Sequence, residues 1–246
     1  VTKLTNKLGV KSIFIFLDDM NATHNCSFHL LKTIRYVDYI FTNKSYNVSE
    51  LKIYTEADIN FFNNRYSLEF HSPILDSNKQ DGYDVLFVGS YEKDRFDILS
   101  FLANNGIIVN VFGNGWPKTN IPGLVIHYKS LDGINYSSAI AASKISLNFL
   151  RKINRDLQTT RSVEIPACGG LILTENTSEH KYILPFPELL FDNKEDCLVK
   201  INNLLVNKNL REELMKKSHN RVVNELKLNY ENLFQEIFTY IQSSES

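Results

Sequence analysis

Short apolar runs that alternate with helix-length segments constrain the fold of this chain more than any other feature of its sequence. The runs are rich in β-branched and aromatic residues and have the length of buried strands. They lie at residues 84–88, 107–112, 124–128, 145–149 and 171–174. Strands that alternate with helices form βαβ units, because parallel strands need a crossover connection. We therefore predict a Rossmann-like, doubly wound parallel sheet over residues 84–206.

The segments between and after these runs have apolar residues at helical spacing. Helices are predicted at residues 94–104, 136–142, 160–167, 195–206, 210–226 and 230–241. A shorter α/β stretch comes first, with strands at residues 12–17 and 39–42, a helix at 27–36, and a short helix with a following strand near 48–53. Residues 55–83 are polar and contain Pro73, which is typical of a linker or a domain boundary.

The balance of charge narrows the classes of function. The 246 residues include 27 basic and 28 acidic side chains, for a formal net charge of -1. A protein that binds nucleic acid or an anionic membrane by electrostatics needs a basic excess, so neither class fits. The 43% hydrophobic content argues against disorder. Cys26, Cys168 and Cys197 are too few and too scattered for a disulfide framework or a zinc site.

The N-terminus gives no sign of a secretory leader. Residues 1–11 contain no apolar core of the kind that a signal peptide has, and no run of about 18 apolar residues occurs in the sequence. We therefore expect a cytoplasmic protein without a transmembrane segment, and peripheral contact with a membrane stays open. The first residue is Val1 rather than Met, so the chain is either a whole protein or a fragment of a longer one.

Several segments lie where ligands bind in a parallel sheet, which is outside the carboxyl ends of the strands. They are Asp18-Asp19, Gly89-Ser90, residues 113–116, residues 127–129 and the loop after Phe149. At Gly89 the backbone can approach a ligand closely, and the helix start after it favours a phosphate. Arg95 would add a bidentate phosphate contact. The alternative is an ordinary strand-to-helix turn with solvated charges.

Glu164 is the most informative residue of the segment 156–170. It lies among apolar residues in a predicted semi-buried helix, where a carboxylate needs a partner or a ligand. Arg161 precedes it at the i,i+3 spacing of an intrahelical ion pair. In the alternative, Glu164 accepts hydrogen bonds from sugar hydroxyls while Arg161 faces a diphosphate. Asp156 lies eight positions before Glu164.

Three further candidates follow strands. Asp18 and Asp19 could form a catalytic base, a metal site or a turn, and the sequence offers no clear further ligand for a metal. His127 differs from the other five histidines because it ends a strand on the expected ligand side. Trp116 either lines the site or packs over the glycine turn that precedes it.

Several of these segments together resemble one enzyme family. They are DVLFVGS, VNVFGNGW, ISLNF and TRSVEIPACGGLILTE, in this order, with FIFLDDM before them. Their order and spacing resemble the CgeB-like (spore maturation protein) glycosyltransferases, which carry a glycosyl transferases group 1 module of the GT-B type. The resemblance runs from residue 12 to residue 238, and its most specific part is the segment 161–170.

The resemblance implies a role for each candidate residue. In the broader family a Glu-x7-Glu motif precedes a segment of small residues. Glu164 matches the second Glu, which holds the ribose hydroxyls of the donor. Asp156 stands at the first position, where the shorter side chain departs from the motif and the implied role is contact with the donor sugar. The implied contacts to the donor diphosphate are Gly89, Ser90, Arg95 and Arg161; those to the base are His127, Tyr128 and Lys129; and the implied catalytic residues are Asp18 and Asp19.

The resemblance also implies an architecture. The fold class is α/β of the GT-B type, with a complete Rossmann-like C-terminal domain and a partial Rossmann-like N-terminal domain. Residues 1–78 are then the end of the acceptor-side domain, residues 79–226 the nucleotide-sugar-binding domain, and residues 227–246 a helix that crosses back to the first domain.

The implied activity is metal-independent transfer of a sugar from a UDP-, GDP- or dTDP-linked donor, without a cofactor. The acceptor is a saccharide, a lipid-linked molecule or a protein, in cell-surface glycan biosynthesis, and nucleic acid is not an expected partner. Two alternatives stay open. One is a sugar-nucleotide epimerase of the same architecture, and the other is a non-catalytic module that binds a nucleotide or a protein partner.

Overall fold

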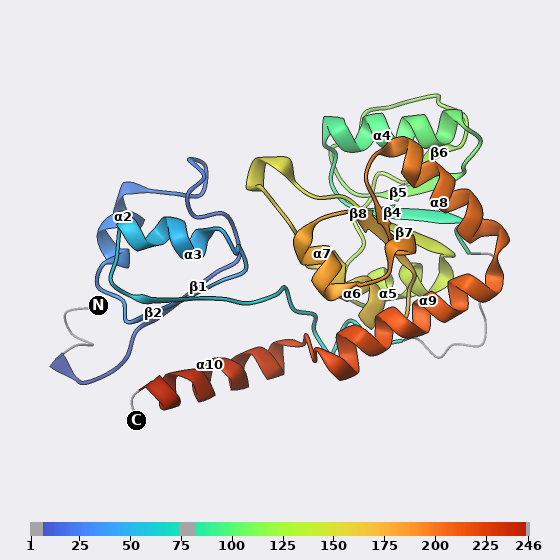
Figure 1. Cartoon of the computed structure of the whole chain (residues 1–246). Helices are drawn as coiled ribbons and strands as arrows, with labels where there is room; N and C mark the ends of the chain where they lie inside the picture. The colour runs from blue at the N-terminus through green and yellow to red at the C-terminus, as the bar shows by residue number, and fades with distance from the viewer. Residues whose placement is uncertain (1–6, 74–81, 245–246) are drawn as a thin grey trace. The chain divides into compact units, whose positions relative to one another are not determined.

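The chain forms two compact units (Figure 1). The structure, a computed structural model, describes residues 7–73 and 82–244. The first unit is Val1–Asn64 with Leu150–Leu157, and the second is Arg65–Phe149 with Gln158–Ser246. The predicted domain boundary at residues 78–79 lies outside the described residues.

A six-stranded parallel sheet forms the centre of the second unit. Its spatial order is β6-β5-β4-β7-β8-β9. The strands are β4 (Val85–Val88), β5 (Val109–Phe112), β6 (Leu124–Ile126), β7 (Ile145–Asn148), β8 (Ile172–Glu175) and β9 (Leu190–Phe191). Counted along the chain, this is the order 3-2-1-4-5-6 of the doubly wound Rossmann fold. The predicted parallel sheet is confirmed, with every strand that the sequence predicted for it.

Helices on both faces explain why the central strands are buried. All four residues of β4 and of β7 are buried. α4 (Lys93–Asn104) and α8 (Lys194–Val206) pack together over one face of the sheet (Figure 1). α5 (Gly133–Ala142) and α6 (Arg161–Ala167) cover the other face, and α9 (Lys208–Asn220) packs on α6.

The sequence did not predict three short elements of the second unit. They are α7 (Ser178–Ile183), the 3-10 turn Pro187–Leu189 and β9. The side chain of Thr177 caps α7 by accepting a hydrogen bond from the His180 amide. Elements of two to six residues show too little periodicity to be recognised.

The end of the chain is helical, as predicted. α9 continues through the π-helical turn Arg221–Glu225, and α10 (Tyr230–Ser244) follows. Arg65 supports this region: its side chain is 4% exposed and its Nη2 lies 2.6 Å from Oε2 of Glu236 in α10. The expected return of α10 to the first domain stays a prediction.

The first unit contains a three-stranded parallel sheet in the order β1-β2-β3. Its elements are β1 (Ile13–Phe16), α2 (Phe28–Ile34), β2 (Tyr39–Thr42), α3 (Asn47–Glu50), the 3-10 turn Leu51–Ile53 and β3 (Asp58–Phe61). β3 corrects the prediction that residues 55–83 are all linker. Only Ile59 of its four residues is buried, because β3 is an edge strand, so the sequence lacks an apolar run there.

Within residues 7–73 and 82–244, no helix has both the length and the apolar composition needed to cross a bilayer.

Substitution of Gly113 by Ala is expected to destabilise the second unit. Gly113 follows β5 with φ +148°, and a Cβ there would lie 2.0 Å from the carbonyl oxygen of Gly89. Relief of that overlap must shift backbone at a strand end, which costs about 1–3 kcal/mol of unfolding free energy or more. Urea denaturation followed by circular dichroism measures the loss.

Gly106→Ala is the matched control for this substitution. Gly106 also has a positive φ, +86°, but a Cβ there meets no heavy atom within 4 Å. Both variants therefore strain the backbone, and only Gly113→Ala adds a collision. Equal losses in the two variants would contradict the steric explanation.

Candidate functional site

The carboxyl ends of β4 and β7 form the candidate site of the second unit. The two strands are neighbours, but the chain leaves β4 toward β5 and leaves β7 toward β8, at opposite edges of the sheet. Ligands of doubly wound sheets bind at such a switch point, because the loops from the two strands diverge there. The residues that follow the two strands are Gly89, Ser90 and Phe149.

Close packing of two glycine turns shapes the β4 side of the switch point. The Gly89 amide donates to the carbonyl oxygen of Phe112 at 2.8 Å. Trp116 donates its indole N–H to the Gly89 carbonyl oxygen at 2.9 Å, and its side chain is buried. The Trp116 ring thus packs against the end of β4 at Gly89, Phe87 and Tyr91. Ser90, the next residue, is exposed.

Arg95 connects the two sides of the switch point. Its guanidinium donates to the carbonyl oxygen of Ser90 at 3.0 Å and to that of Phe149 at 3.4 Å. It also lies 3.4 Å from the carboxylate of Glu92. The residue is only 8% exposed. Arg95 therefore braces the loops after β4 and β7, and its contact with a diphosphate stays a prediction.

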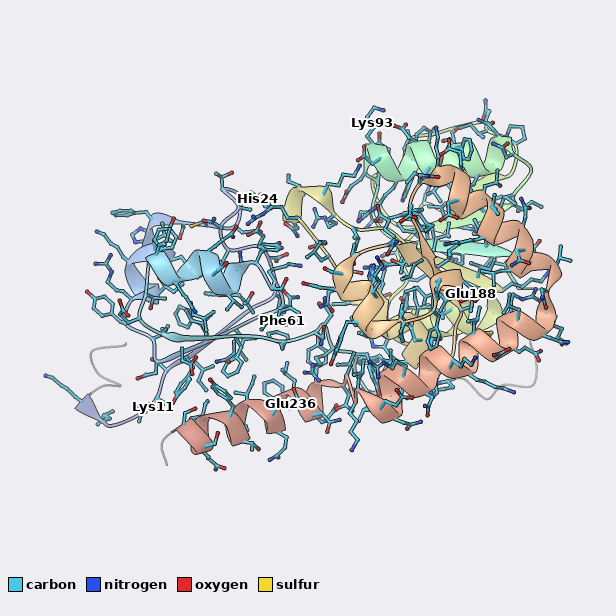
Figure 2. The ribbon with its side chains drawn as sticks, in the orientation of Figure 1. Lys11, His24, Phe61, Lys93, Glu188 and Glu236 are labelled. Atoms are coloured by element: carbon cyan, nitrogen blue, oxygen red, sulfur yellow. The ribbon has the colours of Figure 1, made fainter. Side chains whose placement is uncertain are left out.

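Lys93, the first residue of α4, lies near Arg95 in sequence but in a different environment. Its side chain is 79% exposed and pairs with Asp97 one turn later (Figure 2). The start of α4 therefore presents its first backbone amides beside an exposed cation.

Arg161, the first residue of α6, also reaches the end of β4. Its Nε donates to the carbonyl oxygen of Val88 at 2.7 Å. No ion pair joins Arg161 to Glu164 in the part of the chain that the structure describes, so the intrahelical pair considered from the sequence does not form. Arg161 is half-buried, and the described residues give its two Nη groups no partner. A guanidinium fixed through Nε keeps both Nη groups for an anion.

Glu164 lies one turn further along α6. It is close to His71 and Tyr136, which the sequence did not predict as its neighbours. Its Oε1 is 3.9 Å from Nε2 of His71, and the two side chains are 18% and 14% exposed. The Tyr136 hydroxyl is buried, and burial together with the nearby Glu164 carboxylate raises the pKa of Tyr136 well above its usual value. Glu164 also raises the pKa of Tyr230, after the larger effect of burial.

A chain of buried hydrogen bonds fixes the start of α6. Asn148, the last residue of β7, accepts from the Thr159 hydroxyl at 3.1 Å. Its amide group donates to the Ser162 hydroxyl at 3.3 Å and to the Thr174 hydroxyl at 3.1 Å. Oγ of Ser162 also accepts from the Thr159 amide at 3.0 Å and lies 2.8 Å from Nε2 of His180. β7, β8 and α6 are therefore joined by one network.

The carbonyl oxygen of Glu175 fixes the tautomer of His180. Nδ1 lies 2.6 Å from that oxygen, which can only accept, so Nδ1 carries the proton. Nε2 must then accept the hydrogen bond from Ser162. Burial, opposed by the Glu175 carbonyl, lowers the pKa of His180 to about 4. The network is therefore uncharged at neutral pH, and it holds the helix that carries Arg161 and Glu164.

The segment after β6 contains the three residues predicted to bind the base. The His127 ring stacks on Phe112 with 4.0 Å between centroids and lies 2.9 Å from Oδ1 of Asn110. Burial, assisted by Lys129, lowers the pKa of His127. Tyr128 has φ +49° and an exposed side chain. The His127 side chain is thus engaged with the sheet, while Tyr128, Lys129 and Ser130 are exposed residues.

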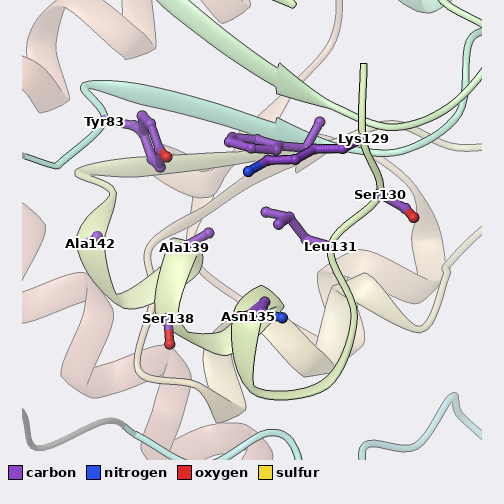
Figure 3. A pocket seen from close by; sticks show the side chains of 9 residues that line it. Tyr83, Lys129, Ser130, Leu131, Asn135, Ser138, Ala139 and Ala142 are labelled. Atoms are coloured by element: carbon purple, nitrogen blue, oxygen red, sulfur yellow. The ribbon is translucent and has the colours of Figure 1, made fainter. Parts of the chain in front are cut away.

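Lys129 lines a cavity of about 400 Å³ in the second unit. Figure 3 shows Lys129, Ser130 and Leu131 on one side of it and α5 on the other. The full lining is Tyr83, Phe112, Lys129, Ser130, Leu131, Asn135, Ser138, Ala139 and Ala142. The lining combines an aromatic wall with amide and hydroxyl groups, a composition that suits a small organic ligand.

Asp18 and Asp19 lie in the first unit and have different environments. Asp19 is fully buried and accepts from Nε of Arg155 at 2.7 Å and from the Asn47 amide at 3.0 Å. Burial alone would raise the pKa of Asp19, but these hydrogen bonds lower it. A carboxylate held in this way is a weak proton acceptor. The predicted catalytic base is therefore better placed on Asp18, which is exposed and accepts from Asn154.

Asp156 does not share a unit with Glu164, although the sequence motif pairs them. It belongs to the first unit, where Nζ of Lys44 lies 2.6 Å from its Oδ1 and both side chains are 5% exposed. Its other oxygen accepts from the Arg151 amide at 3.3 Å. Burial raises the pKa of Asp156 against the opposing effect of Lys44. Both oxygens therefore have partners within the first unit, and the implied contact of Asp156 with the donor sugar stays a prediction.

Sequence reasoning missed His71, Tyr136, His180 and Arg155. His71 lies in the polar stretch 55–83, where histidine carries no local signal. Tyr136 and His180 resemble ordinary core residues in their helices. The positive φ of Arg155, +49°, is also invisible in the sequence.

Comparison with known proteins adds a family match. A family model described as "Glycosyl transferase-like" matches residues 95–238. None of the curated proteins compared matches the chain in sequence.

Three solved structures are similar in fold. TarM of S. aureus, solved with UDP and α-GlcNAc-glycerol, gives a TM-score of 0.65 at 11% identity over 94% of this chain and 50% of TarM. T4 phage β-glucosyltransferase with UDP-glucose gives 0.59 at 17% identity, over 97% of this chain and 76% of that enzyme. Trehalose 6-phosphate synthase of Burkholderia multivorans gives 0.62 at 10% identity, over 100% and 70%. The chain spans half the length of TarM, and the likeness confirms the predicted GT-B type of fold.

The His180 network is expected to make stability depend on pH. An unfolded chain binds a proton on His180 near pH 6.5, whereas the folded chain does so only near pH 4. Stability conferred by the neutral ring is therefore lost as the pH falls through this interval. Between about pH 7 and about pH 5 this one group is expected to lower the unfolding free energy by about 2 kcal/mol.

Urea denaturation of the wild type and of His180→Gln at both pH values measures this effect. Glutamine keeps one donor and one acceptor but does not titrate. The wild type should lose about 2 kcal/mol more than the variant on acidification. Parallel losses would show that His180 titrates normally and that the network is not closed as described.

Proposed function

The chain belongs to the glycosyl transferase-like family, and from that premise we propose that it transfers a sugar from a nucleoside-diphosphate sugar to an acceptor hydroxyl. The observation that carries the proposal is the switch point of β4 and β7, beside which α6 places the Arg161 guanidinium and the Glu164 carboxylate one turn apart. TarM was solved with UDP and the T4 enzyme with UDP-glucose, so a UDP-linked donor is proposed first, with GDP- and dTDP-linked donors as alternatives.

The diphosphate is proposed to lie over the turn Gly89-Ser90. Negative charge develops on the departing nucleoside diphosphate during transfer, and fixed donors stabilise it. The Nη groups of Arg161 and the first amides of α4 supply such donors. Arg95 contributes by holding the carbonyl groups of Ser90 and Phe149, which keeps the turn in place.

The nucleoside is proposed to lie between Glu164 and the segment after β6. A carboxylate accepts hydrogen bonds from vicinal hydroxyls, so Glu164 is assigned to the ribose. The backbone after Tyr128 is assigned to the base, with Lys129 and Ser130 at the cavity mouth. Of the acceptor-side pair, Asp18 is proposed as the base that removes the acceptor proton in an inverting reaction.

Within the family we propose a CgeB-like enzyme of the cytoplasm that contributes to cell-surface glycans. The segment RSVEIPACGG at residues 161–170 supports this assignment. The balanced net charge of -1 supports a saccharide, lipid-linked or protein acceptor over DNA, the substrate named for the T4 enzyme.

Two substitutions are expected to separate the proposed ribose and diphosphate contacts. Glu164→Gln should weaken binding of both UDP and uridine, because it removes the charge that strengthens the ribose hydrogen bonds. Arg161→Gln should weaken UDP alone, because uridine has no diphosphate. Each loss is expected to be about 10- to 100-fold in Kd, as for hydrogen bonds to charged groups. Isothermal titration of the purified chain measures both ligands, and GDP and dTDP with their nucleosides follow if UDP does not bind.

Glu213→Gln is the matched control, since Glu213 is an exposed residue of α9 that pairs with Lys217. It should leave both affinities unchanged. If the wild type binds none of the nucleoside diphosphates, the proposed function is wrong. If Arg161→Gln weakens uridine as much as UDP, or Glu164→Gln leaves uridine binding unchanged, the assignment of separate contacts is wrong.

The proposed reaction needs no metal, because Arg161 and the amides at the start of α4 meet the diphosphate. Hydrolysis of UDP-glucose by the purified chain, or its transfer to an acceptor, is therefore expected to proceed at the same rate in excess EDTA. A rate that falls in EDTA and recovers with Mg²⁺ or Mn²⁺ would contradict this part of the proposal.

A further inference from the structure

His71 is held in one orientation at the edge of the site. Its Nδ1 accepts a hydrogen bond from the Ser67 amide at 3.1 Å, and its ring meets that of Tyr136 edge to face with 5.8 Å between centroids. Because Nδ1 is an acceptor, the proton of the neutral ring lies on Nε2. Burial, opposed by Glu164, lowers the pKa of His71, so the ring is neutral at pH 7.

The N–H of His71 points to a carboxylate that it does not reach. The 3.9 Å between Nε2 and Oε1 of Glu164 is too long for a hydrogen bond. Within the described residues, the Nε2–H of His71 has no hydrogen bond to Glu164 or to another group, and the carboxylate of Glu164 lies beside it and beside Tyr136. Both side chains keep some exposure, so a ligand can approach them.

Tyr136 is a buried polar group beside Glu164. It is 5% exposed, and the Glu164 carboxylate acts on its hydroxyl. The ring of Tyr136 and the carboxylate of Glu164 therefore form one wall of this place, with the His71 ring against it. The Glu164 carboxylate contributes to the pKa shifts of both Tyr136 and His71.

We propose that His71 is a further donor-binding residue, and that its Nε2–H and the Glu164 carboxylate together hold the ribose hydroxyls of the nucleotide sugar. The proposal rests on the proposed function, which assigns the ribose to Glu164. A hydroxyl at about 2.8 Å from each group accepts from Nε2–H and donates to Oε1, which bridges the 3.9 Å gap. One donor beside one acceptor matches a hydroxyl, which is both.

The chemistry of the cluster favours a diol over a cation. Among residues 7–73 and 82–244, no group of three or more His, Cys, Asp and Glu side chains is placed to hold a metal ion. The proton on Nε2 of His71 also turns a donor, not a lone pair, toward Glu164. A diol uses that donor, whereas a metal would require the ring in its other tautomer.

The test compares UDP with its dideoxy analogue, which lacks both ribose hydroxyls. His71→Ala is expected to weaken binding of UDP about tenfold, as loss of one hydrogen bond to a ligand predicts. It should leave the affinity for the dideoxy analogue unchanged, because the group that His71 binds is absent from that ligand. Isothermal titration of the full chain gives the four dissociation constants, and thermal melting verifies that each variant is folded.

Two further variants separate binding from structure. His71→Gln keeps an N–H at a similar reach and should recover most of the affinity for UDP. His29→Ala changes an exposed histidine of the first unit and should change neither affinity. A purely structural role would make His71→Ala weaken both ligands equally.

The outcomes distinguish this proposal from the one on which it rests. Equal weakening of both ligands by His71→Ala, or unchanged binding of UDP, overturns the role of His71 while Glu164→Gln still tests the function. If the wild type binds no nucleoside diphosphate, the proposed function falls, and this inference falls with it.

Discussion

Two guanidinium groups complete the hydrogen bonding where the central strands of the second unit end, and the candidate site depends on them. Arg161 takes the carbonyl oxygen of Val88, and Arg95 takes those of Ser90 and Phe149. Carbonyl groups beyond a strand end have no ladder partner, and leaving them buried without a donor is costly. Because the two arginines lie in the first turns of α4 and α6, the contacts that finish the strands also fix the starts of these helices.

Near α6, the polar groups divide into a buried neutral set and a half-buried charged set. Asn148, Ser162 and His180 satisfy one another, and a fully satisfied network is rigid. It uses no charge to hold the helix in place. Arg161 and Glu164 do not pair with each other. The Arg161 guanidinium can therefore bind an anion, and the Glu164 carboxylate can accept hydrogen bonds from hydroxyl groups.

The sequence predicted what local patterns encode. The strands of the second unit were found because burial on both faces makes them rich in apolar residues, and Glu164 because a carboxylate among apolar residues is unusual. The partners of Arg95 and Asp156 were not predictable in the same way. Phe149 lies 54 residues after Arg95, and Lys44 lies 112 residues before Asp156. No local pattern reports such contacts, so the roles of these two side chains emerged only with the structure.

The segment Leu150–Leu157 is held by ion pairs that the sequence does not reveal. It follows β7 and leads to α6, yet it belongs to the first unit. Arg155 anchors it there by donating to both Asp19 and Glu50, with its guanidinium 4.2 Å from the ring centroid of Tyr46. Forked contacts to two carboxylates fix orientation as well as charge, which a lysine could not do. The segment thus has its own anchor within the first unit, although β7 precedes it and α6 follows it in the chain.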